Sequence, residues 1–317
     1  MRYTLRQLEY FIAAGETGSI TLASERVHIS QPSVSTAISH LERELGVQLF
    51  IRHHAQGLSL TPAGRTLLRE AKVVIGQAES LYSVASDAGT EVRGRLSIGC
   101  MVTLAPMLAP ELMQSFMTAY PLTQVRGVEG NLEQIVDGLR RSQIDVAITY
   151  DLQIPDDTAF TPLVSLPPHV VLAETHRLAQ RSALALDDLV TEPLILLDLP
   201  LSRDYFLGLF AKAGLQPTVS ARSPNQEVVR TMVANGHGYS LFNVRPRCDR
   251  AMDGRRLVPV RLTGRHQPLA VGVATLRQLS KSRLVTAFEQ HCVASISAAH
   301  VPGMVAPGTA LRSRKRA

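Results

Sequence analysis

Cysteines are few in this sequence and do not form a pair or a cluster. Three occur among 317 residues, Cys100, Cys248 and Cys292, and they lie far apart. We therefore expect reduced thiols, with neither a disulfide framework nor a metal site. Thiol sensing is a weak alternative, because Cys100 has no basic neighbours that would favour its thiolate.

The sequence also lacks a long apolar run that could span a bilayer. Its first residues, MRYTLRQLEYF, carry charges where a secretory signal would have a continuous apolar region. We therefore expect a cytoplasmic protein with no membrane partner. Low-complexity tracts are absent too, so the chain has room for two or three globular domains.

Acidic residues are slightly outnumbered, which gives a formal net charge of +6. This excess favours a polyanionic partner without proving one. Part of it lies in the last residues, Arg312, Arg314, Lys315 and Arg316. Because the chain after Pro302 has glycine and proline but no periodicity, residues 301–317 are expected to form a disordered basic tail.

Three helices are predicted before residue 46. Apolar residues at helical spacing indicate the first over residues 4–14, and Gly15 and Gly18 should end it. A short second helix then runs to Val27, capped by Ser19 or Thr21.

The third predicted helix follows the short turn 27–29 and begins with polar residues. Ser30 is a good N-cap, Pro32 is tolerated in the first turn, and Gly46 ends the helix. One apolar stripe runs along it, made by Val34, Ile38, Leu41 and Leu45.

Two helices joined by so short a turn predict a helix-turn-helix, whose second helix can enter a major groove of DNA. The polar start of that helix would then face the bases. Gln31 could pair with adenine, Ser33 and Thr36 could reach base edges or phosphates, and His40 also lies off the apolar stripe. The same pattern fits a helix face that is merely solvated.

Two short strands, 47–50 and 58–61, are predicted after the third helix, around a loop at 53–57. A hairpin in this place is a wing, and Arg52, His53 and His54 would supply phosphate contacts. Metal binding by the two histidines is not expected, because neighbours in a strand point oppositely and no third ligand is evident.

Together these residues resemble the LysR-type transcriptional regulators. The resemblance rests on Leu8, Phe11, Gly18-Ser19, Ala23, Val27, Ser30-Gln31-Pro32-Ser33-Val34-Ser35, Ile38, Leu41-Glu42, Leu45-Gly46, Leu49-Phe50, Arg52 and Leu60-Thr61-Pro62-Ala63-Gly64. It continues more loosely to about residue 300.

The resemblance implies a DNA-binding domain over residues 1–62. Its expected DNA-binding residues are Ser30, Gln31, Pro32, Ser33, Thr36, His40, Arg52, His53 and His54. Thr36 and His40 stand where many members carry arginine or another long polar residue, and Gln56 lies in a wing region that is often basic. These departures imply weaker phosphate anchoring or a different base preference.

A linker over residues 63–93 is predicted to be a long helix followed by a hinge from Asp87 to Gly94. Its heptad seam consists of Leu68, Ala71, Ile75, Ala78, Tyr82 and Ala85. The alternative is a helix that lies on its own domain. The resemblance implies a dimerisation helix, and hence a homodimer or homotetramer.

Strands and helices alternate from residue 94 to 300, which predicts an α/β fold with parallel strands and helices on both faces. The first series has strands at 96–100, 124–128 and 144–149, and a second series follows. The resemblance implies a two-lobed, periplasmic-binding-protein-like effector domain. Its first lobe would hold residues 94–162 and 266–300 and its second residues 163–265, with crossovers near Thr161–Leu163 and Leu262–Pro268.

Ligands of such folds bind beside the carboxyl ends of strands and the N-termini of helices. This rule selects eight effector-binding candidates, Thr103, Asn131, Leu132, Thr149, Tyr150, Ser202, Arg203 and Asn243. Backbone N–H groups and a guanidinium would suit a carboxylate or another small anion. Each residue also has a structural alternative: Thr103 and Ser202 as helix caps, Arg203 as the partner of Asp204, and Asn243 as a turn residue.

No catalytic motif or cofactor signature is apparent. We therefore expect a transcriptional regulator that binds double-stranded promoter DNA, is modulated by a small-molecule effector, and could contact RNA polymerase. An effector-independent regulator is the first alternative. A solute-binding protein or small-molecule enzyme on the same two-lobed fold is the second.

Overall fold

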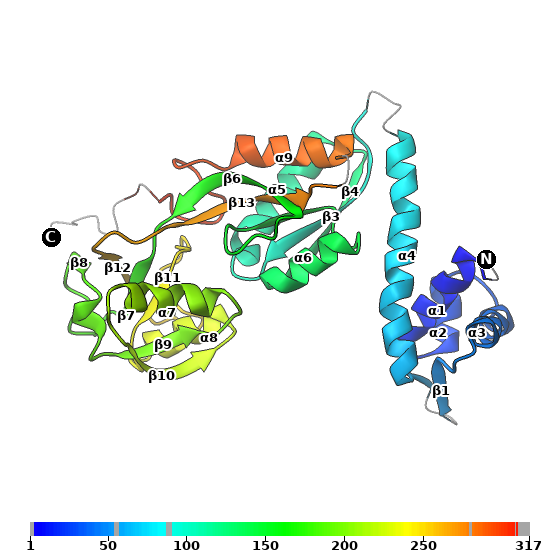
Figure 1. Cartoon of the computed structure of the whole chain (residues 1–317), viewed down its shortest axis with the longest axis horizontal. Helices are drawn as coiled ribbons and strands as arrows, with labels where there is room; N and C mark the ends of the chain where they lie inside the picture. Colours follow the sequence, from blue (N-terminus) through cyan, green and yellow to red (C-terminus); the bar gives the residue numbers. More distant parts are fainter. Residues whose placement is uncertain (1–2, 54–56, 87–90, 279–280, 308, 310–317) are drawn as a thin grey trace. The chain divides into compact units, whose positions relative to one another are not determined.

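A computed structural model describes residues 3–53, 57–86, 91–278, 281–307 and 309 (Figure 1). The chain forms two compact units, an N-terminal one that includes the long helix α4 and a C-terminal one that begins before strand β3. Among the described residues, no helix is long and apolar enough to cross a membrane.

The N-terminal unit has four helices and a hairpin in its described part. They are α1 (Leu5–Thr17), α2 (Ile20–Arg26), α3 (Gln31–Leu45), β1 (Phe50–His53), β2 (Gly57–Leu60) and α4 (Pro62–Ser86) (Figure 1). The core contains Leu8 and Phe11 of α1 and the predicted stripe of α3, of which Val34, Ile38 and Leu41 are buried. The helix-turn-helix and its wing are therefore present.

Helix α1 is longer than predicted, because Gly15 does not end it. Gly15 lies within the helix, where a Cβ would come 3.1 Å from the side chain of Leu68 in α4. The glycine thus allows α1 and α4 to approach closely. Gly18 ends the helix in the left-handed region, with φ of 64°.

The first wing strand begins where the predicted strand ended. The Glu42 carboxylate accepts hydrogen bonds from the backbone N–H groups of Leu49 (2.7 Å) and Phe50 (3.1 Å). These bonds tie the turn after α3 to that helix, so pairing with β2 starts only at Phe50. A side chain in α3 therefore sets the start of the wing.

Helix α4 begins at Pro62, and the Thr61 hydroxyl accepts a hydrogen bond from the N–H of Gly64 at 2.9 Å. Ala71 is buried in the N-terminal core, and Leu68 and Ile75 pack against it. These three residues of the heptad seam therefore pack against the N-terminal unit itself, as the alternative assignment proposed. Side chains 79, 80 and 82–86, including those of Tyr82 and Ala85, lie outside the described residues.

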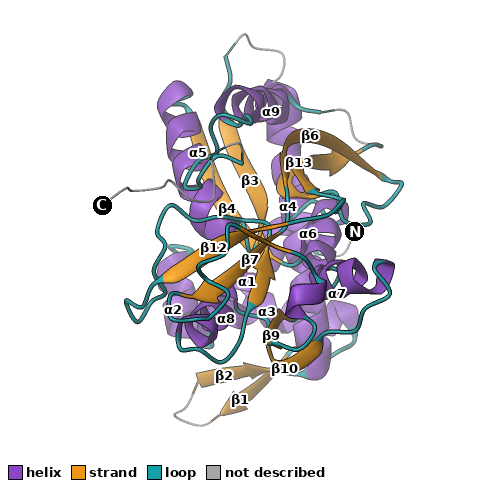
Figure 2. Cartoon of the chain, turned by 90° about the vertical axis from the view of Figure 1, so that its left-hand side faces the viewer, coloured by secondary structure: helices purple, strands orange, loops and turns teal. Residues whose placement is uncertain are grey.

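The first lobe contains a five-stranded sheet in the order β4-β3-β5-β13-β6. Its elements are β3 (Gly94–Met101), α5 (Ala105–Ala119), β4 (Thr123–Gly130), α6 (Leu132–Arg140), β5 (Val146–Tyr150), β6 (Thr158–Leu166), β13 (Leu269–Leu276) and α9 (Arg283–Ser295). The rings of Phe116 in α5 and Phe288 in α9 are 5.2 Å apart, and α6 lies across the sheet from these helices (Figure 2).

The sheet is mixed rather than parallel throughout. Strands β3, β4 and β5 are parallel, as predicted, but β13 is antiparallel to both β5 and β6. The reason is the path of the chain, which leaves the first lobe through β6 and returns through β13. Strand β6 was not predicted from the sequence.

The second lobe holds a four-stranded sheet, β11-β7-β12-β8, and a parallel pair, β10-β9. Its elements are β7 (His169–Ala173), β8 (Ala183–Leu184), the 3-10 helix η1 (Asp187–Leu189), β9 (Pro193–Leu197), α7 (Ser202–Lys212), β10 (Thr218–Ser223), α8 (Gln226–Ala234), β11 (Ser240–Phe242) and β12 (Leu257–Leu262). Strands β8 and β12 were not predicted.

One of the two predicted crossovers is displaced. Thr161 and Pro162 lie inside β6, paired with Val273 and Gly272 of β13, so the chain crosses only between Leu166 and His169. The return lies between Leu262 and Leu269, near its predicted place. Figure 1 shows β6 and β13 side by side along their length.

The chain after residue 300 differs from the expected disordered tail. Val301 and Met304 are 1% and 3% exposed and belong to the core of the first lobe. The backbone N–H groups of Arg247 and Val305 donate to the carbonyls of Gly303 (3.4 Å) and Arg245 (2.9 Å), respectively. Apolar burial thus orders this segment, while 308 and 310–317 lie outside the described residues.

Gly303 offers a test of this C-terminal segment. It has φ of 65°, and a Cβ would lie 2.4 Å from the Met107 carbonyl oxygen. Gly214 has φ of 72° with nothing within 4 Å, so it is a matched control for backbone strain alone. We expect Gly303→Ala to lower the free energy of unfolding by about 1–3 kcal/mol more than Gly214→Ala. Equal losses in denaturant titrations would show that the segment does not pack closely against α5.

Candidate DNA interface and inter-lobe site

The first turns of α3 separate polar from apolar side chains. Gln31, Pro32, Ser33 and Thr36 are exposed, whereas Val34 between them is completely buried. Amide and hydroxyl groups thus point away from the core on a helix that the core holds firmly. This is the arrangement that base contacts in a major groove require.

Ser30 occupies the N-cap position, but its side chain does not cap the helix. Its hydroxyl is hydrogen-bonded to the Ser33 hydroxyl at 2.8 Å instead of to a backbone N–H. Ser30 is therefore the N-cap residue, as predicted, but without a side-chain capping bond. Both hydroxyls remain exposed beside Gln31.

His40 lies farther along the same helix and is half-buried. Its Nδ1 is 3.2 Å from the amide nitrogen of Gln7 in α1, and its Nε2 is 3.9 Å from a Glu44 oxygen. A shallow hollow on this surface is lined by Gln7, Pro32, Ser33, Thr36, Ala37 and His40. Gln7 belongs to this surface although its position within α1 gave no sign of it.

The wing is described only in part. Arg52 in β1 is exposed, and its Nη2 is 3.4 Å from the Ser39 hydroxyl of α3. His53 ends β1, but its side chain lies outside the described residues, as do His54 and Gln56 entirely. Arg52 is thus the wing cation that the structure places beside α3.

Glu16 of α1 joins three helices of the N-terminal unit. Its carboxylate is 2.6 Å from Lys72 of α4 and 2.5 Å from Arg26 of α2. Partial burial raises the pKa of Glu16, but the hydrogen bonds with Lys72 and Arg26 outweigh it, so the pKa lies below its ordinary value. The ionised carboxylate therefore helps to hold the helix-turn-helix on α4.

In the C-terminal unit, Thr103 and Tyr150 meet at the carboxyl end of the first lobe's sheet. Both are buried, and their hydroxyl oxygens are 3.2 Å apart. Burial raises the pKa of Tyr150, so it carries a neutral hydroxyl that can donate or accept. Thr103 does not cap α5, which starts after Leu104 without a side-chain cap.

Tyr205 and Asn243 join the two lobes. The Asn243 amide nitrogen donates to the Leu166 carbonyl at 2.9 Å and to the Tyr205 hydroxyl oxygen at 3.2 Å. That hydroxyl donates in turn to the Gln267 carbonyl at 2.8 Å. Asn243 is therefore more than a turn residue. Tyr205 was missed because it looks like an ordinary residue of an amphipathic helix.

Two buried side-chain oxygens of effector candidates lack a hydrogen-bond partner among the described residues, Asn243 Oδ1 and Thr149 Oγ1. Since the Asn243 nitrogen is identified by the Leu166 carbonyl that it meets, the unpartnered atom is an acceptor. Thr149 precedes Tyr150 in β5, and successive strand residues point to opposite faces. Thr149 and Tyr150 thus do not share a face.

Three other effector candidates lie in structural positions. Asn131 Oδ1 accepts from the N–H of Gln134 at 2.9 Å and caps α6, while Leu132 is buried in the core. Ser202 is buried in the first turn of α7 and makes no capping bond.

Arg203 is paired as its alternative assignment proposed. Its guanidinium lies 3.1 Å from Asp204 and 3.2 Å from Asp198. These two carboxylates raise the pKa of Arg203. The guanidinium therefore already has anionic partners within the second lobe.

Comparison with known proteins identifies both units. Residues 5–65 match the family described as "Bacterial regulatory helix-turn-helix protein, lysR family", and residues 89–297 match "LysR substrate binding domain". The chain belongs to the LysR family. It is a DNA-binding transcriptional regulator with an effector-binding domain, as the sequence resemblance predicted.

Several LysR-family proteins are similar over most of this chain. A hydrogen peroxide-inducible genes activator of Dickeya chrysanthemi is 31% identical, covering 75% of this chain and 78% of its own length. The transcriptional regulator CysB of Burkholderia cenocepacia is 33% identical, covering 78% and 80%. HinK from Pseudomonas aeruginosa, whose crystal structure is known, is 36% identical in sequence. The two structures align with a TM-score of 0.63 over 93% of this chain and 99% of HinK.

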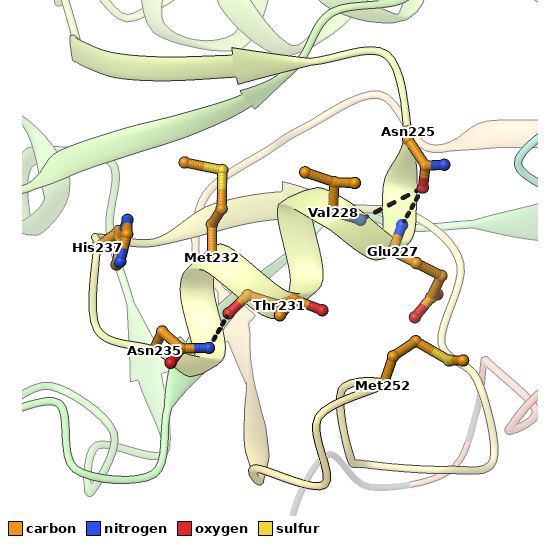
Figure 3. Close-up of a pocket in the computed structure, with 8 residues that line it drawn as sticks. All are labelled: Asn225, Glu227, Val228, Thr231, Met232, Asn235, His237 and Met252. Carbon is orange, nitrogen blue, oxygen red and sulfur yellow. Dashed lines mark hydrogen bonds between the residues drawn. The ribbon is translucent and has the colours of Figure 1, made fainter.

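A separate hollow on this LysR-family chain lies over α8 (Figure 3). Val228 and Met252 beside it are 46% and 82% exposed. Two of its polar side chains are already used: Asn225 caps α8, and Asn235 donates to Thr231 and Asp253. Val228, Met232 and Met252 supply the apolar part of its lining.

We expect Glu16→Gln to lower the free energy of unfolding at neutral pH by about 1 kcal/mol. Because the folded-state pKa of Glu16 is below about 4.5, its contribution is present above that pH and is lost as pH falls through the folded-state value. Denaturation curves of the two proteins should therefore converge in acid. Glu25→Gln, at an exposed glutamate of α2, is the control. A difference that does not shrink as the pH is lowered would contradict the assignment.

The thiols should differ in reactivity. Cys100 and Cys292 are buried, and burial raises the pKa of Cys100 and raises that of Cys292 to about 12. Cys248 is exposed. We expect a maleimide to label one thiol per native chain, none after Cys248→Ser, and three in denaturant. DNA binding should be unchanged in the protein in which all three cysteines are replaced by serine. A loss of DNA binding in that protein would support thiol sensing.

Proposed function

We propose that this LysR-family protein reads promoter DNA with the amino end of α3 and responds to a small polar molecule bound between its two lobes. The observation that carries the first part is the exposure of Gln31, Ser33 and Thr36 on a helix whose Val34 and Ile38 are 0% and 2% exposed. A helix held by its apolar stripe can place these groups at fixed positions in a groove.

The roles follow from side-chain chemistry. The Gln31 amide can make two hydrogen bonds with adenine, and the hydroxyls of Ser30, Ser33 and Thr36 can reach base edges or phosphates. Pro32 offers an apolar contact. In the wing, Arg52 supplies a phosphate contact, and the same role stays with His53 and His54 as a prediction.

The proposed effector site consists of two hydrogen-bonded pairs, Thr103 with Tyr150 and Tyr205 with Asn243, the second of which joins the lobes. The free acceptor of Asn243 favours a molecule with a hydrogen-bond donor such as a hydroxyl or amino group. A carboxylate in the same molecule could accept from the hydroxyls of Thr103 and Tyr150. Arg203 serves an anion less readily, since it is paired with Asp198 and Asp204.

The proposed active species has two or four copies. On α4, Val74 and Leu81 are 39% and 68% exposed, and a second α4 helix would remove these apolar side chains from water. Two copies would present two reading helices to successive turns of a duplex. Ligand binding between the lobes would then change the spacing of the DNA-binding units. Such a protein acts where the chromosome is, in the cytoplasm.

The proposed DNA interface contains residues that read bases and a residue that contacts phosphates, and substitutions distinguish the two. Gln31→Ala and Ser33→Ala should each reduce the preference for the bound sequence over random DNA by about 1–3 kcal/mol. Arg52→Ala should weaken binding to all sequences alike and flatten its salt dependence. Arg261→Ala, at an exposed arginine of β12, controls for loss of charge. Fluorescence anisotropy on both duplexes would measure this, and equal losses on both for Gln31→Ala would refute base reading.

The effector assignment can be tested with small hydroxy acids, amino acids and dicarboxylates added singly to the full chain. A compound that raises the melting temperature should bind about tenfold more weakly to Tyr150→Phe and to Asn243→Leu, because each variant loses one hydrogen bond to the compound. Thr149→Val, on the opposite face of β5, should leave its affinity unchanged. If no compound alters melting or promoter binding, the protein is an effector-independent regulator.

A further inference from the structure

A short series of hydrogen bonds joins the start of α1 to the middle of α3. The backbone N–H of Thr4 donates to Gln7 Oε1 at 2.8 Å, as part of the capping box of α1. The other atom of that amide, Gln7 Nε2, is 3.2 Å from His40 Nδ1. Thr4 is thereby connected through Gln7 to a histidine of the proposed reading helix.

This series determines which nitrogen of His40 carries the proton. A backbone N–H can only donate, so the Gln7 atom that meets it must be the carbonyl oxygen. The remaining amide atom is then the NH₂ group, which donates to His40 Nδ1. A neutral imidazole that accepts at Nδ1 carries its proton on Nε2. The His40 tautomer thus follows from the backbone N–H of Thr4, which always carries its hydrogen and can only donate.

The Nε2–H of His40 has no strong partner of its own among the described residues. Its nearest carboxylate oxygen, on Glu44, is 3.9 Å away, which is too long for a hydrogen bond. The His40 side chain is 35% exposed and borders the hollow that Ser33 and Thr36 also line. Ser33, Thr36 and His40 follow one another at spacings of three and four residues, so they share one face of α3.

We propose that Gln7 is a positioning residue for DNA recognition, because it holds His40 with Nε2–H directed to a hydrogen-bond acceptor of the duplex. That acceptor is N7 or O6 of guanine, O4 of thymine, or a phosphate oxygen. The inference rests on the proposed function, in which this face of α3 lies against DNA. It adds a residue of α1 that does not itself touch the bases.

The test uses Gln7→Glu, which keeps the cap of α1 because a carboxylate still accepts from the Thr4 N–H. It cannot donate to His40 Nδ1, so a neutral imidazole there carries its proton on Nδ1 and Nε2 becomes an acceptor. His40→Ala and the double variant complete a cycle. The full chain first selects its preferred duplex from a random library. Affinities for that duplex and its single-base variants are then measured at pH 8.

We expect His40→Ala to reduce discrimination at one base pair by about 5- to 100-fold. Gln7→Glu should reduce it at the same base pair although His40 is present, and the double variant should lose no more than His40→Ala. If the acceptor is a phosphate, both single variants weaken all duplexes alike, and the added charge of Gln7→Glu contributes to that loss in the single and the double variant; the ¹⁵N measurement on Gln7→Glu then decides whether Gln7 sets the His40 tautomer. Discrimination is a ratio, so the added negative charge of Gln7→Glu cancels in it.

The outcomes separate this inference from the proposed function. Unchanged binding by Gln7→Glu, with a clear effect of His40→Ala, would overturn the role of Gln7 and leave base reading intact. No effect of either variant, while Gln31→Ala still relaxes specificity, would remove both residues from recognition. No effect of Gln31→Ala as well would refute the proposed function.

A direct measurement reads the His40 tautomer in the native protein. The imidazole ¹⁵N resonances of His40, assigned by their loss in His40→Ala, should show a protonated Nε2 and an unprotonated Nδ1 at pH 8. A protonated Nδ1 would overturn the inference. In Gln7→Glu, if it folds with an unchanged melting temperature, Nδ1 should become protonated.

Discussion

The DNA recognition proposed here depends on burial of one side of α3. Val34, Ile38 and Leu41 pack against Leu8 and Phe11 of α1, and the cost of exposing that stripe prevents the helix from rotating about its axis. A rotation would bring the polar residues at the start of α3 into the core, where their hydrogen bonds to water would be lost. The apolar residues of the helix therefore determine which of its residues can face DNA.

Hydrogen bonds and close contacts also fix the wing and α4 relative to α3. Glu42 holds the backbone of Leu49 and Phe50 and so determines where the wing begins. Thr61 accepts from Gly64, and a Cβ at Gly64 would lie 2.1 Å from the Leu49 carbonyl oxygen, so α4 starts against the same turn. Wing and linker helix are thus positioned relative to α3 by local contacts.

The C-terminal unit depends on a different constraint, the path of the chain between its lobes. Strands β6 and β13 pair along their length, and the crossings follow at Leu166–His169 and Leu262–Leu269. The polar groups of Tyr205 and Asn243 meet lobe-one backbone at this junction. The ligand site proposed above lies where the chain crosses between the lobes, so its occupancy would alter the relation of the lobes.

Sequence patterns determined the local structure of this protein. The stripe of α3, the terminating Gly46, and the alternation of strands and helices from Gly94 onward specify elements through neighbours in the chain, so periodicity was sufficient to find them. The polar start of α3 was likewise visible, because its exposure follows from the same period. Only the tertiary structure decided the rest. The contacts of Gln7 with His40, of Tyr205 with Asn243, and of Arg203 with Asp198 join residues from different parts of the chain. Likewise, Gly15 remains helical because α4 packs over it, and Val301 and Met304 are ordered because the first lobe buries them. Such contacts depend on distances in space that no local pattern encodes.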